Sequence, residues 1–441
     1  MQQPTRRPGP RTEPGASTGP GPRLEQSPFF TSSPFEPQVD PVTSLDRIDL
    51  TDMGAMAVGD PHAAWRLLRE QAPVFWHEKG THGTRGKGFW AVSTFEGCTE
   101  VHRRSELFSN SDTEFMDLLP EDIPYQLSSM DPPELAAYRK VLQRFFTAKA
   151  VERSADGVRA IVNMVLDGAA QVEQPFNFHE QVAQRIPFLA TCGLFQMPPE
   201  SVQALAEQLQ NLDYGGTDPL KAFTDAVIIF FDEHTRGWSK GENDSLVCAI
   251  LDADIDGRPI ERADALAYLW VLFVGALDTV AHSSSIGLLS LFHHPAQLER
   301  LKNDLSLMPS AVTELLRWTS SSNVVKHLVM ADTELQGVQL KQGDYVATFP
   351  PSANRDERAF TDPYRFDVGR GREAPVFTFG GGPHLCLGHQ FARMELKIIF
   401  EELLRRFPNI EQAGPASRGQ AFTMVLSPLA ELPVRLGTPA A

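Results

Sequence analysis

The sequence predicts a mainly α-helical fold with minor β-structure, formed by one large domain. Apolar residues recur at helical spacing along most of the chain, whereas strand-like runs are few and short. The 441 residues are 42% hydrophobic, which is enough for a sizeable core, and no linker-like composition interrupts the chain after about residue 45. We therefore expect residues 41–441 to form a single domain.

The first 40 residues differ in composition from the rest of the chain. Prolines recur throughout this segment, with glycine and serine between them. Proline at this density prevents a regular helix or sheet, and a transit peptide would need an amphipathic helix. We expect residues 1–40 to be a disordered tail.

Helical spacing accounts for most of the remaining chain. In chain order, it predicts helices over Pro61–Gln71, Glu134–Phe146, Ala150–Ala169, Pro198–Gln210, Pro219–Thr235, Ala263–His293, Pro295–Leu305, Pro309–Trp318 and Gly388 to about Arg406. Short strand-like runs lie at Gly88–Val92, His327–Met330, Tyr345–Thr348 and Leu432–Leu436. No internal repeat is visible.

Charge and cysteine content limit the class of protein. The formal net charge of −16 argues against binding to nucleic acid or to an anionic membrane surface. No run approaches the ~20 uninterrupted apolar residues of a membrane span, since the longest, Leu266–Leu277, ends at Asp278. The cysteines lack paired spacing and the N-terminus lacks a signal-peptide core, so we expect a cytoplasmic protein. They are Cys98, Cys192, Cys248 and Cys386.

One cysteine lies in a glycine-rich loop directly before a long amphipathic helix. The loop reads Phe379-Gly380-Gly381-Gly382-Pro383-His384-Leu385-Cys386-Leu387-Gly388. A thiol at a helix start meets unpaired backbone N–H groups and the positive end of the helix dipole, which favour the thiolate. Glycines allow the backbone to approach a flat macrocycle and to point amides at the sulfur. The loop therefore predicts that Cys386 is a thiolate ligand to haem iron.

Three simpler interpretations of this loop were weighed against haem ligation. A phosphate-binding loop would carry a Lys-Ser/Thr pair, which is absent. Structural zinc requires four Cys or His ligands in paired clusters, and only His384, Cys386 and His389 lie here. An inert buried cysteine is the third alternative, and it leaves the rest of the motif unexplained.

The loop resembles the cysteine motif of the cytochrome P450 haem-thiolate monooxygenases, Phe-Gly-x-Gly-x-His-x-Cys-x-Gly, at every fixed position. The resemblance extends over roughly residues 45–436 and is strongest to soluble bacterial members of the camphor-oxidising and actinobacterial sterol-oxidising branches. It implies the single-domain P450 fold, with haem b (iron protoporphyrin IX) held between the long central helix and the helix after the cysteine loop.

A second motif lies in the middle of the long helix predicted over Ala263–His293. Gly275, Asp278 and Thr279 are poor helix formers in an otherwise apolar segment, which usually marks a local distortion. In the P450 family this position holds the acid–alcohol pair above the haem. The resemblance therefore implies that Thr279 positions dioxygen and a water while Asp278 relays protons. The alternative is that Asp278 pairs with a neighbouring cation and Thr279 packs.

The resemblance also nominates partners for the haem and its negatively charged propionates. His384 and Arg139 stand where the family has a propionate histidine and arginine, and His327 stands where the family usually has an arginine. Phe379, Gly380 and Gly388 of the cysteine loop are the remaining expected haem contacts.

A third match is Glu314 and Arg317, an acid and a guanidinium three residues apart on one helix face. The family buries this pair as a structural element and joins it to a later arginine, for which Arg365 is the candidate. We expect these three residues to hold the fold rather than to act in catalysis.

No flavin or iron–sulfur module is fused to the chain, so electrons are expected from a separate ferredoxin or flavodoxin with its reductase. Four cations are candidates for a basic docking patch behind the cysteine, although each could equally be part of a solvated helix face. They are Arg139, Lys140, Arg144 and Arg393.

Candidate substrate-pocket residues follow from the same resemblance and are all apolar. They are Phe115, Met116, Leu119, Ile123, Leu272, Ala276, Val324, Val325 and Leu426. Each could equally belong to the core. The apolar set and the two related branches favour a terpenoid or steroid-like substrate.

Together these observations predict a haem-dependent monooxygenase that inserts one oxygen atom from O2 into a small apolar molecule, with hydroxylation the favoured outcome. Two alternatives stay open at this point. One is a peroxygenase driven by H2O2, and the other is a non-catalytic haem-thiolate binding or accessory protein.

Overall fold

The computed structural model describes residues 44–51, 61–80, 84, 86–111, 127–210, 219–236, 245–371, 376–418 and 429–438. The tail predicted over residues 1–40 lies outside these ranges. The α-helices are α2 (Pro61–Gln71), α3 (Phe95–Arg103), α4 (Glu134–Leu142), α5 (Ala148–Ala170), α6 (Arg185–Leu194), α7 (Pro199–Gln210), α8 (Pro219–Thr235), α9 (Leu246–Leu251), α10 (Arg262–His293), α11 (Pro295–Asn303), α12 (Met308–Thr319), α13 (Pro350–Ala353) and α14 (His389–Arg406). Short helical turns are η3 (Leu45–Arg47), η4 (Gln143–Phe145), η5 (His179–Ala183), η6 (Leu305–Leu307) and η7 (Gly382–His384).

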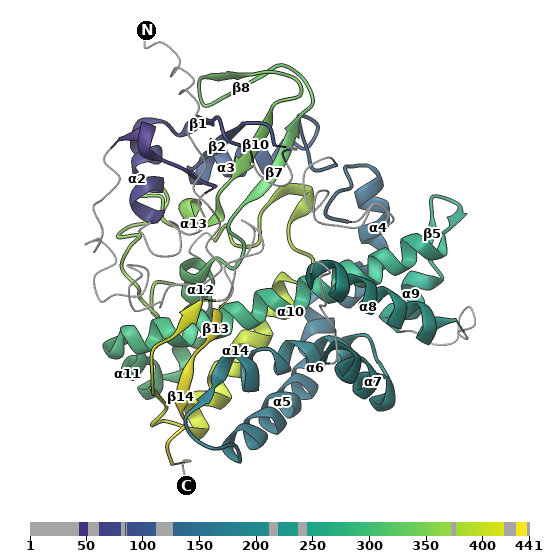
Figure 1. The fold of residues 1–441 in the computed structure, drawn as a ribbon, viewed down its shortest axis with the longest axis vertical. Helices are drawn as coiled ribbons and strands as arrows, with labels where there is room; N and C mark the ends of the chain where they lie inside the picture. Colours follow the sequence, from purple (N-terminus) through teal and green to yellow (C-terminus); the bar gives the residue numbers. More distant parts are fainter. Residues whose placement is uncertain are drawn as a thin grey trace.

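The strands are short. They are β1 (Val74–His77), β2 (Phe89–Val92), β3 (Phe108–Ser109), β4 (Phe176–Asn177), β5 (Asp254–Ile255), β6 (Arg258–Pro259), β7 (Val325–Val329), β8 (Thr333–Leu335), β9 (Val338–Leu340), β10 (Tyr345–Thr348), β11 (Glu411–Gln412), β12 (Ser417–Arg418), β13 (Leu429–Glu431) and β14 (Pro433–Arg435). Figure 1 shows the largest sheet with α2 and α3 in the upper part of the molecule and the long helices below it. The prediction of a mainly α-helical fold with minor β-structure is confirmed.

Helix α10 crosses the centre of the molecule (Figure 1) and joins two apolar cores. Its first half, from Ala265 to Phe273, is buried in a cluster with residues of α8 and α9. Its second half, from Val280 to Leu291, is buried in a cluster with residues of α5, α12 and α14. Between the two cores, residues 274–279 are only half-buried or exposed. Burial at both ends therefore fixes the position of this open middle segment.

A glycine sets the close approach of α14 and α12 to α10. A Cβ atom built on Gly287 would lie 3.1 Å from Phe400 of α14 and 3.2 Å from Leu315 of α12. Either contact is tighter than real Cβ atoms usually make, so a larger residue would push the helices apart. The helix that follows the cysteine loop is thereby held directly against the central helix.

The five-stranded sheet has the order β1-β2-β10-β7-β3. Strands β10 and β2 are parallel, and the other neighbours are antiparallel. In this register His327 of β7 pairs with Val346 of β10, and Val329 pairs with Phe108 of β3. His327 therefore belongs to an inner strand, covered by a neighbour on each side.

Each predicted helix is present within a few residues of its expected ends, and each predicted strand is present as part or all of a strand. Four helices were not predicted: α3, α6, α9 and α13. Helix α3 contains Gly97 and Thr99, which are poor helix formers, and it begins because the Thr94 side chain accepts from the Gly97 amide. Helix α6 contains Pro187 in its first turn. A side-chain cap begins α3, whereas α6 has none and depends on the packing of its buried residues.

Of the helices in the described ranges, α10 alone has the length and hydropathy of a membrane span. Over half (56%) of its most apolar window is buried inside the fold. A central core helix satisfies the same criterion, and the two buried clusters on α10 give it that role here. The apolar character of α10 is thus explained by packing.

Candidate active site at the cysteine loop

The cysteine loop closes on itself before α14 begins. The Gly380 amide donates to the Phe377 carbonyl at 2.8 Å, and the Cys386 amide donates to the Phe379 carbonyl at 3.0 Å. Gly388 is the N-cap of α14, so the sulfur lies one short turn before the helix, as the sequence predicted. The loop therefore presents Cys386 from a hydrogen-bonded turn on a rigid helix.

Two loop glycines are required by α3. Gly382 has φ +61°, and a Cβ there would lie 1.9 Å from the His102 carbonyl oxygen. Gly380 has φ +66°, and its Cβ would lie 3.2 Å from His102 Nδ1. Both glycines were predicted from the need to approach a macrocycle. The structure adds a different reason, which is close packing of the loop against His102.

Opposing effects act on the pKa of the Cys386 thiol. The Gly388 and His389 amides and the charge of Arg139 favour the thiolate. Desolvation of the sulfur by the surrounding protein outweighs them, although Cys386 as a residue is exposed, so the pKa of its thiol is raised above its usual value. The amides at the helix start favour the thiolate, as expected, but desolvation of the sulfur is the larger effect on the pKa of Cys386. A coordinated metal ion removes a thiol proton outright.

The acid–alcohol pair lies on the open segment of α10. The helix is continuous there, so the local distortion expected from the sequence does not interrupt it, and the Thr279 hydroxyl donates to the Gly275 carbonyl at 3.0 Å. Asp278 has accessible surface, yet surrounding protein desolvates its carboxyl and raises its pKa. No ion pair to Asp278 is found within the described residues. A carboxyl in this state holds a proton more readily than a surface aspartate does.

The residues between α10 and the cysteine loop fit a flat macrocycle. A Cβ on Gly275 or on Gly388 would meet nothing within 4 Å, so both backbones border open space. Buried imidazole nitrogens form no hydrogen bond of normal geometry among the described residues: both nitrogens of His327, whose pKa the Phe108 backbone nevertheless influences, and Nε2 of His384. Such donors require an acceptor, and a propionate carboxylate would supply one.

Arg139 contacts the protein rather than standing free. Its Nη2 donates to the Leu385 carbonyl at 2.7 Å, one residue before the cysteine. Burial lowers the pKa of Arg139, and the nearby Cys386 opposes that shift. The structure thus places Arg139, His384 and Cys386 at one end of the loop. Haem contacts of Phe379, Gly380, Gly388, His384, His327 and Arg139 stay predictions.

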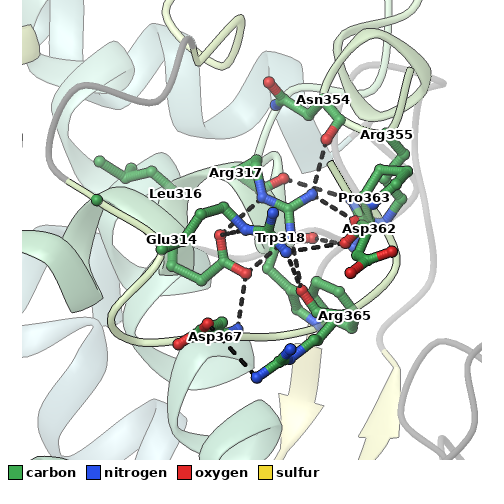
Figure 2. Close-up of polar contacts among 12 residues, drawn as sticks. Glu314, Leu316, Arg317, Trp318, Asn354, Arg355, Asp362, Pro363, Arg365 and Asp367 are labelled. Atoms are coloured by element: carbon green, nitrogen blue, oxygen red, sulfur yellow. Dashed lines mark hydrogen bonds and ion pairs between the residues drawn. The ribbon is translucent and has the colours of Figure 1, made fainter. Parts of the chain in front are cut away.

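The Glu314–Arg317 pair of α12 is fully buried and fully hydrogen-bonded (Figure 2). Arg317 donates to the Glu314 carboxylate at 2.7 and 2.8 Å. Its remaining N–H groups donate to the carbonyls of Asn354 at 2.8 Å, Pro363 at 2.6 Å and Arg365 at 3.4 Å. All five guanidinium donors are used.

The predicted third member of this cluster was wrong. Arg365 contributes only its backbone carbonyl to Arg317, and its side chain is 64% exposed. The guanidinium that reaches Glu314 belongs to Arg370, whose Nε lies 3.1 Å from Oε2. The loop between them folds back, so its later arginine points inward.

The cluster also anchors the cysteine loop. The Asn354 side chain accepts from the Phe377 amide at 2.7 Å and donates to the Thr378 hydroxyl at 2.9 Å. That hydroxyl donates to the Leu316 carbonyl of α12 at 2.7 Å. The residues directly before Phe379 are therefore fixed to the same helix that carries the buried ion pair.

The candidate pocket residues divide into two groups. Leu272 and Ala276 are half-buried on α10, Val325 is half-buried at the start of β7, and Val324 is fully buried in the core under the sheet. Phe115, Met116, Leu119, Ile123 and Leu426 lie outside the described residues.

Within the candidate basic patch, two cations are committed to internal contacts. Arg139 bonds the Leu385 carbonyl, and Arg393 donates to the Thr313 hydroxyl at 3.0 Å. Lys140, Arg144 and Leu385 are exposed. A docking surface would therefore depend mainly on the two exposed cations.

Comparisons with known proteins agree with this geometry. A profile of the cytochrome P450 family matches residues 192–415, about half of the chain. Cytochrome P450 126 of Mycobacterium tuberculosis (strain CDC 1551 / Oshkosh) is 32% identical, with 84% of this chain and 94% of the relative covered. A steroid C26-monooxygenase of Mycobacterium bovis is 30% identical, with 84% and 88% covered.

A solved structure gives the same result for the fold. A Mycobacterium marinum cytochrome P450 in complex with pseudoionone aligns with a TM-score of 0.74 at 26% identity, covering 85% of this chain and 94% of that one. The cysteine motif, the open segment of α10 and these similarities lead to one conclusion. The chain belongs to the cytochrome P450 family and is a haem b-dependent monooxygenase.

Proposed function

We propose that this enzyme inserts one oxygen atom from O2 into a small apolar substrate of terpenoid or steroid-like type, with hydroxylation as the main outcome. Haem b, held by Cys386, supplies the oxygen-activating chemistry when bound. The observation that carries the proposal is the Asp278–Thr279 pair, which is exposed at Asp278 and half-buried at Thr279 in the middle segment of α10, between its two cores.

The two side chains have complementary roles in this proposal. The Thr279 hydrogen is committed to the Gly275 carbonyl, so its oxygen is left to accept a hydrogen bond from a water or from a proton donor. Desolvation raises the pKa of Asp278, so its carboxyl holds and donates a proton at higher pH than a surface aspartate would. In this arrangement Asp278 would hold a transferable proton, and Thr279 would hold the water that receives it, next to the haem that Cys386 would bind.

The substrate class is supported by lining residues and by relatives. Leu272 and Ala276 give the open face of α10 an apolar surface, which favours apolar ligands. Curated relatives include steroid C26-monooxygenases from Mycobacterium bovis and Rhodococcus jostii, at 30% and 29% identity. The proposal is therefore a cytoplasmic enzyme that acts on a terpenoid or steroid-like substrate.

Electrons are proposed to come from a separate ferredoxin or flavodoxin with its reductase. Lys140 and Arg144 are exposed beside the cysteine loop in a chain whose net charge is −16. Local positive charge would steer an acidic partner to this face. Replacement of Lys140 by Glu should raise the KM for an acidic ferredoxin in a salt-dependent way. The matched change Lys341→Glu, in the exposed turn between β9 and β10, should not.

The deciding experiment compares Thr279→Ala with Thr279→Ser, which keeps the hydroxyl. With a bound substrate and a reductase system, Thr279→Ala should consume electrons normally but release peroxide instead of product, whereas Thr279→Ser should stay coupled. Unchanged coupling in Thr279→Ala would contradict the relay. Product formed only when H2O2 is added would instead indicate a peroxygenase, and haem binding without any turnover would indicate a non-catalytic protein.

A further inference from the structure

His102 of α3 is hydrogen-bonded on both ring nitrogens in a way that fixes its tautomer. The Gly381 amide donates to Nδ1 at 3.3 Å, so Nδ1 carries no proton. Nε2 therefore carries the hydrogen and donates to the Thr348 hydroxyl at 3.1 Å. The Thr348 hydroxyl in turn donates a hydrogen bond to the Val325 carbonyl at 3.1 Å. Burial lowers the pKa of His102 to about 3, which agrees with a neutral ring.

The same ring is wedged between the cysteine loop and the sheet. It packs edge-on against Phe377, with 4.8 Å between the ring centroids, and against His327, with 4.9 Å. Gly380 and Gly382 have no room for a Cβ against His102. His102 therefore contacts the loop before the cysteine and the strand that carries His327 at the same time.

His327 and His384 offer unused donors beside this ring. His327 is 2% exposed, and neither of its ring nitrogens forms a hydrogen bond of normal geometry among the described residues, although the Phe108 backbone lies close enough to act on its pKa. Nε2 of His384 is also buried without such a hydrogen bond. The pKa of His327 is lowered well below its usual value, first by burial and then by the neighbouring His102 and His384, so all three imidazoles lie in one electrostatic environment. An imidazole N–H donor on each of His327 and His384 would suit a carboxylate acceptor.

We infer that His102 is a positioning residue of the haem site, which fixes the cysteine loop and orients His327 so that His327 and His384 together bind a haem propionate. The inference rests on the proposed haem contacts of His327 and His384 and adds a residue from α3 that acts through them. His102 itself touches the loop and the strand, not the haem.

The test uses the haem-loaded enzyme and measures haem transfer to apomyoglobin together with the ferric–ferrous midpoint potential. His102→Phe keeps an aromatic ring against Phe377 and His327 but removes both hydrogen bonds. It should speed haem loss about tenfold or more, the effect of weakening one charge-assisted hydrogen bond, and shift the potential. The carbon monoxide spectrum should stay that of a thiolate complex. His62→Phe, a buried histidine in aromatic contact on α2, should leave both values unchanged.

A double-mutant cycle separates positioning from general destabilisation. If His102 acts through His327, adding His102→Phe to His327→Ala should not accelerate haem loss further. Fully additive effects, or a parent-like rate and potential in His102→Phe, would overturn the inference. Should the Phe variant fail to fold, Thr348→Val tests the same idea, because it removes the acceptor of Nε2 together with the bond from Thr348 to the Val325 carbonyl. A parent-like haem-loss rate and potential in Thr348→Val would overturn the inference equally. Absence of a thiolate spectrum in the parent would refute the haem function itself, which is a distinguishable result.

Discussion

Replacing Glu314 by Gln should destabilise the enzyme far more than an exposed ion pair of the same spacing would suggest. The Glu314 carboxylate accepts two bonds from Arg317, one from the Asp367 amide at 2.9 Å and one from Arg370 at 3.1 Å. Both side chains of the Glu314–Arg317 pair are 0% exposed. Removing the negative charge leaves the Arg317 guanidinium buried without its counter-ion.

Breaking one partner of a buried pair costs about 3–5 kcal/mol, whereas an exposed pair contributes about 0–1 kcal/mol. The exposed comparison is Glu299→Gln, since Glu299 pairs with Lys302 at the same three-residue spacing and is 61% exposed. Unfolding of the haem-loaded proteins in guanidinium chloride, followed by far-ultraviolet circular dichroism, measures the loss in the free energy of unfolding for both variants. Similar losses for Glu314→Gln and Glu299→Gln would refute the reasoning, because burial would then carry no penalty.

Three further predictions follow from particular contacts. Arg370→Gln should lower the midpoint of denaturation more than Arg365→Gln, because Arg370 is 13% exposed and reaches Glu314 whereas Arg365 is 64% exposed; equal losses would restore the original assignment. Gly382→Ala should lower the free energy of unfolding by at least about 1–2 kcal/mol and reduce haem loading, because Gly382 has φ +61° and its Cβ would lie 1.9 Å from the His102 carbonyl oxygen. Gly157→Ala, on the exposed face of α5, should leave stability unchanged or increase it. The pKa of His102 falls from 6.5 in the unfolded chain to about 3 in the folded protein, so between these pH values the unfolded chain binds one more proton. The stability that the neutral His102 ring contributes is therefore complete above pH 6.5 and is lost as the pH falls toward 3. Between pH 6 and 4 the free energy of unfolding of the parent should therefore fall more steeply than that of His102→Asn, by up to about 1.4 kcal/mol per pH unit, and parallel slopes would contradict it.

The sequence was informative where local pattern decides structure. Cys386 and its glycines form a contiguous motif before an amphipathic helix, and Thr279 lies in a long apolar helix, so each could be placed without knowledge of distant contacts. Both positions follow from periodicity and helix-terminus chemistry alone.

Other features depend on contacts between distant parts of the chain. Arg365 and Arg370 lie in one irregular segment, and only the path of that segment decides which guanidinium reaches Glu314. His102 lies on a helix with poor propensity and meets Gly381 across 279 residues of sequence. No local pattern marks such a residue, and its role became visible only from two directed hydrogen bonds and its ring contacts.

The central claim is that Cys386 provides the thiolate ligand of haem iron. The most direct measurement is the absorption spectrum of the dithionite-reduced protein under carbon monoxide, for the parent, Cys386→Ala and Cys98→Ala. Cys98 is a suitable control because it is fully buried and its sulfhydryl donates to the Val92 carbonyl. We predict a strongly red-shifted Soret band in the parent and in Cys98→Ala, and its loss in Cys386→Ala. A red-shifted band that persists in Cys386→Ala, or that is missing from the haem-loaded parent, would contradict the claim.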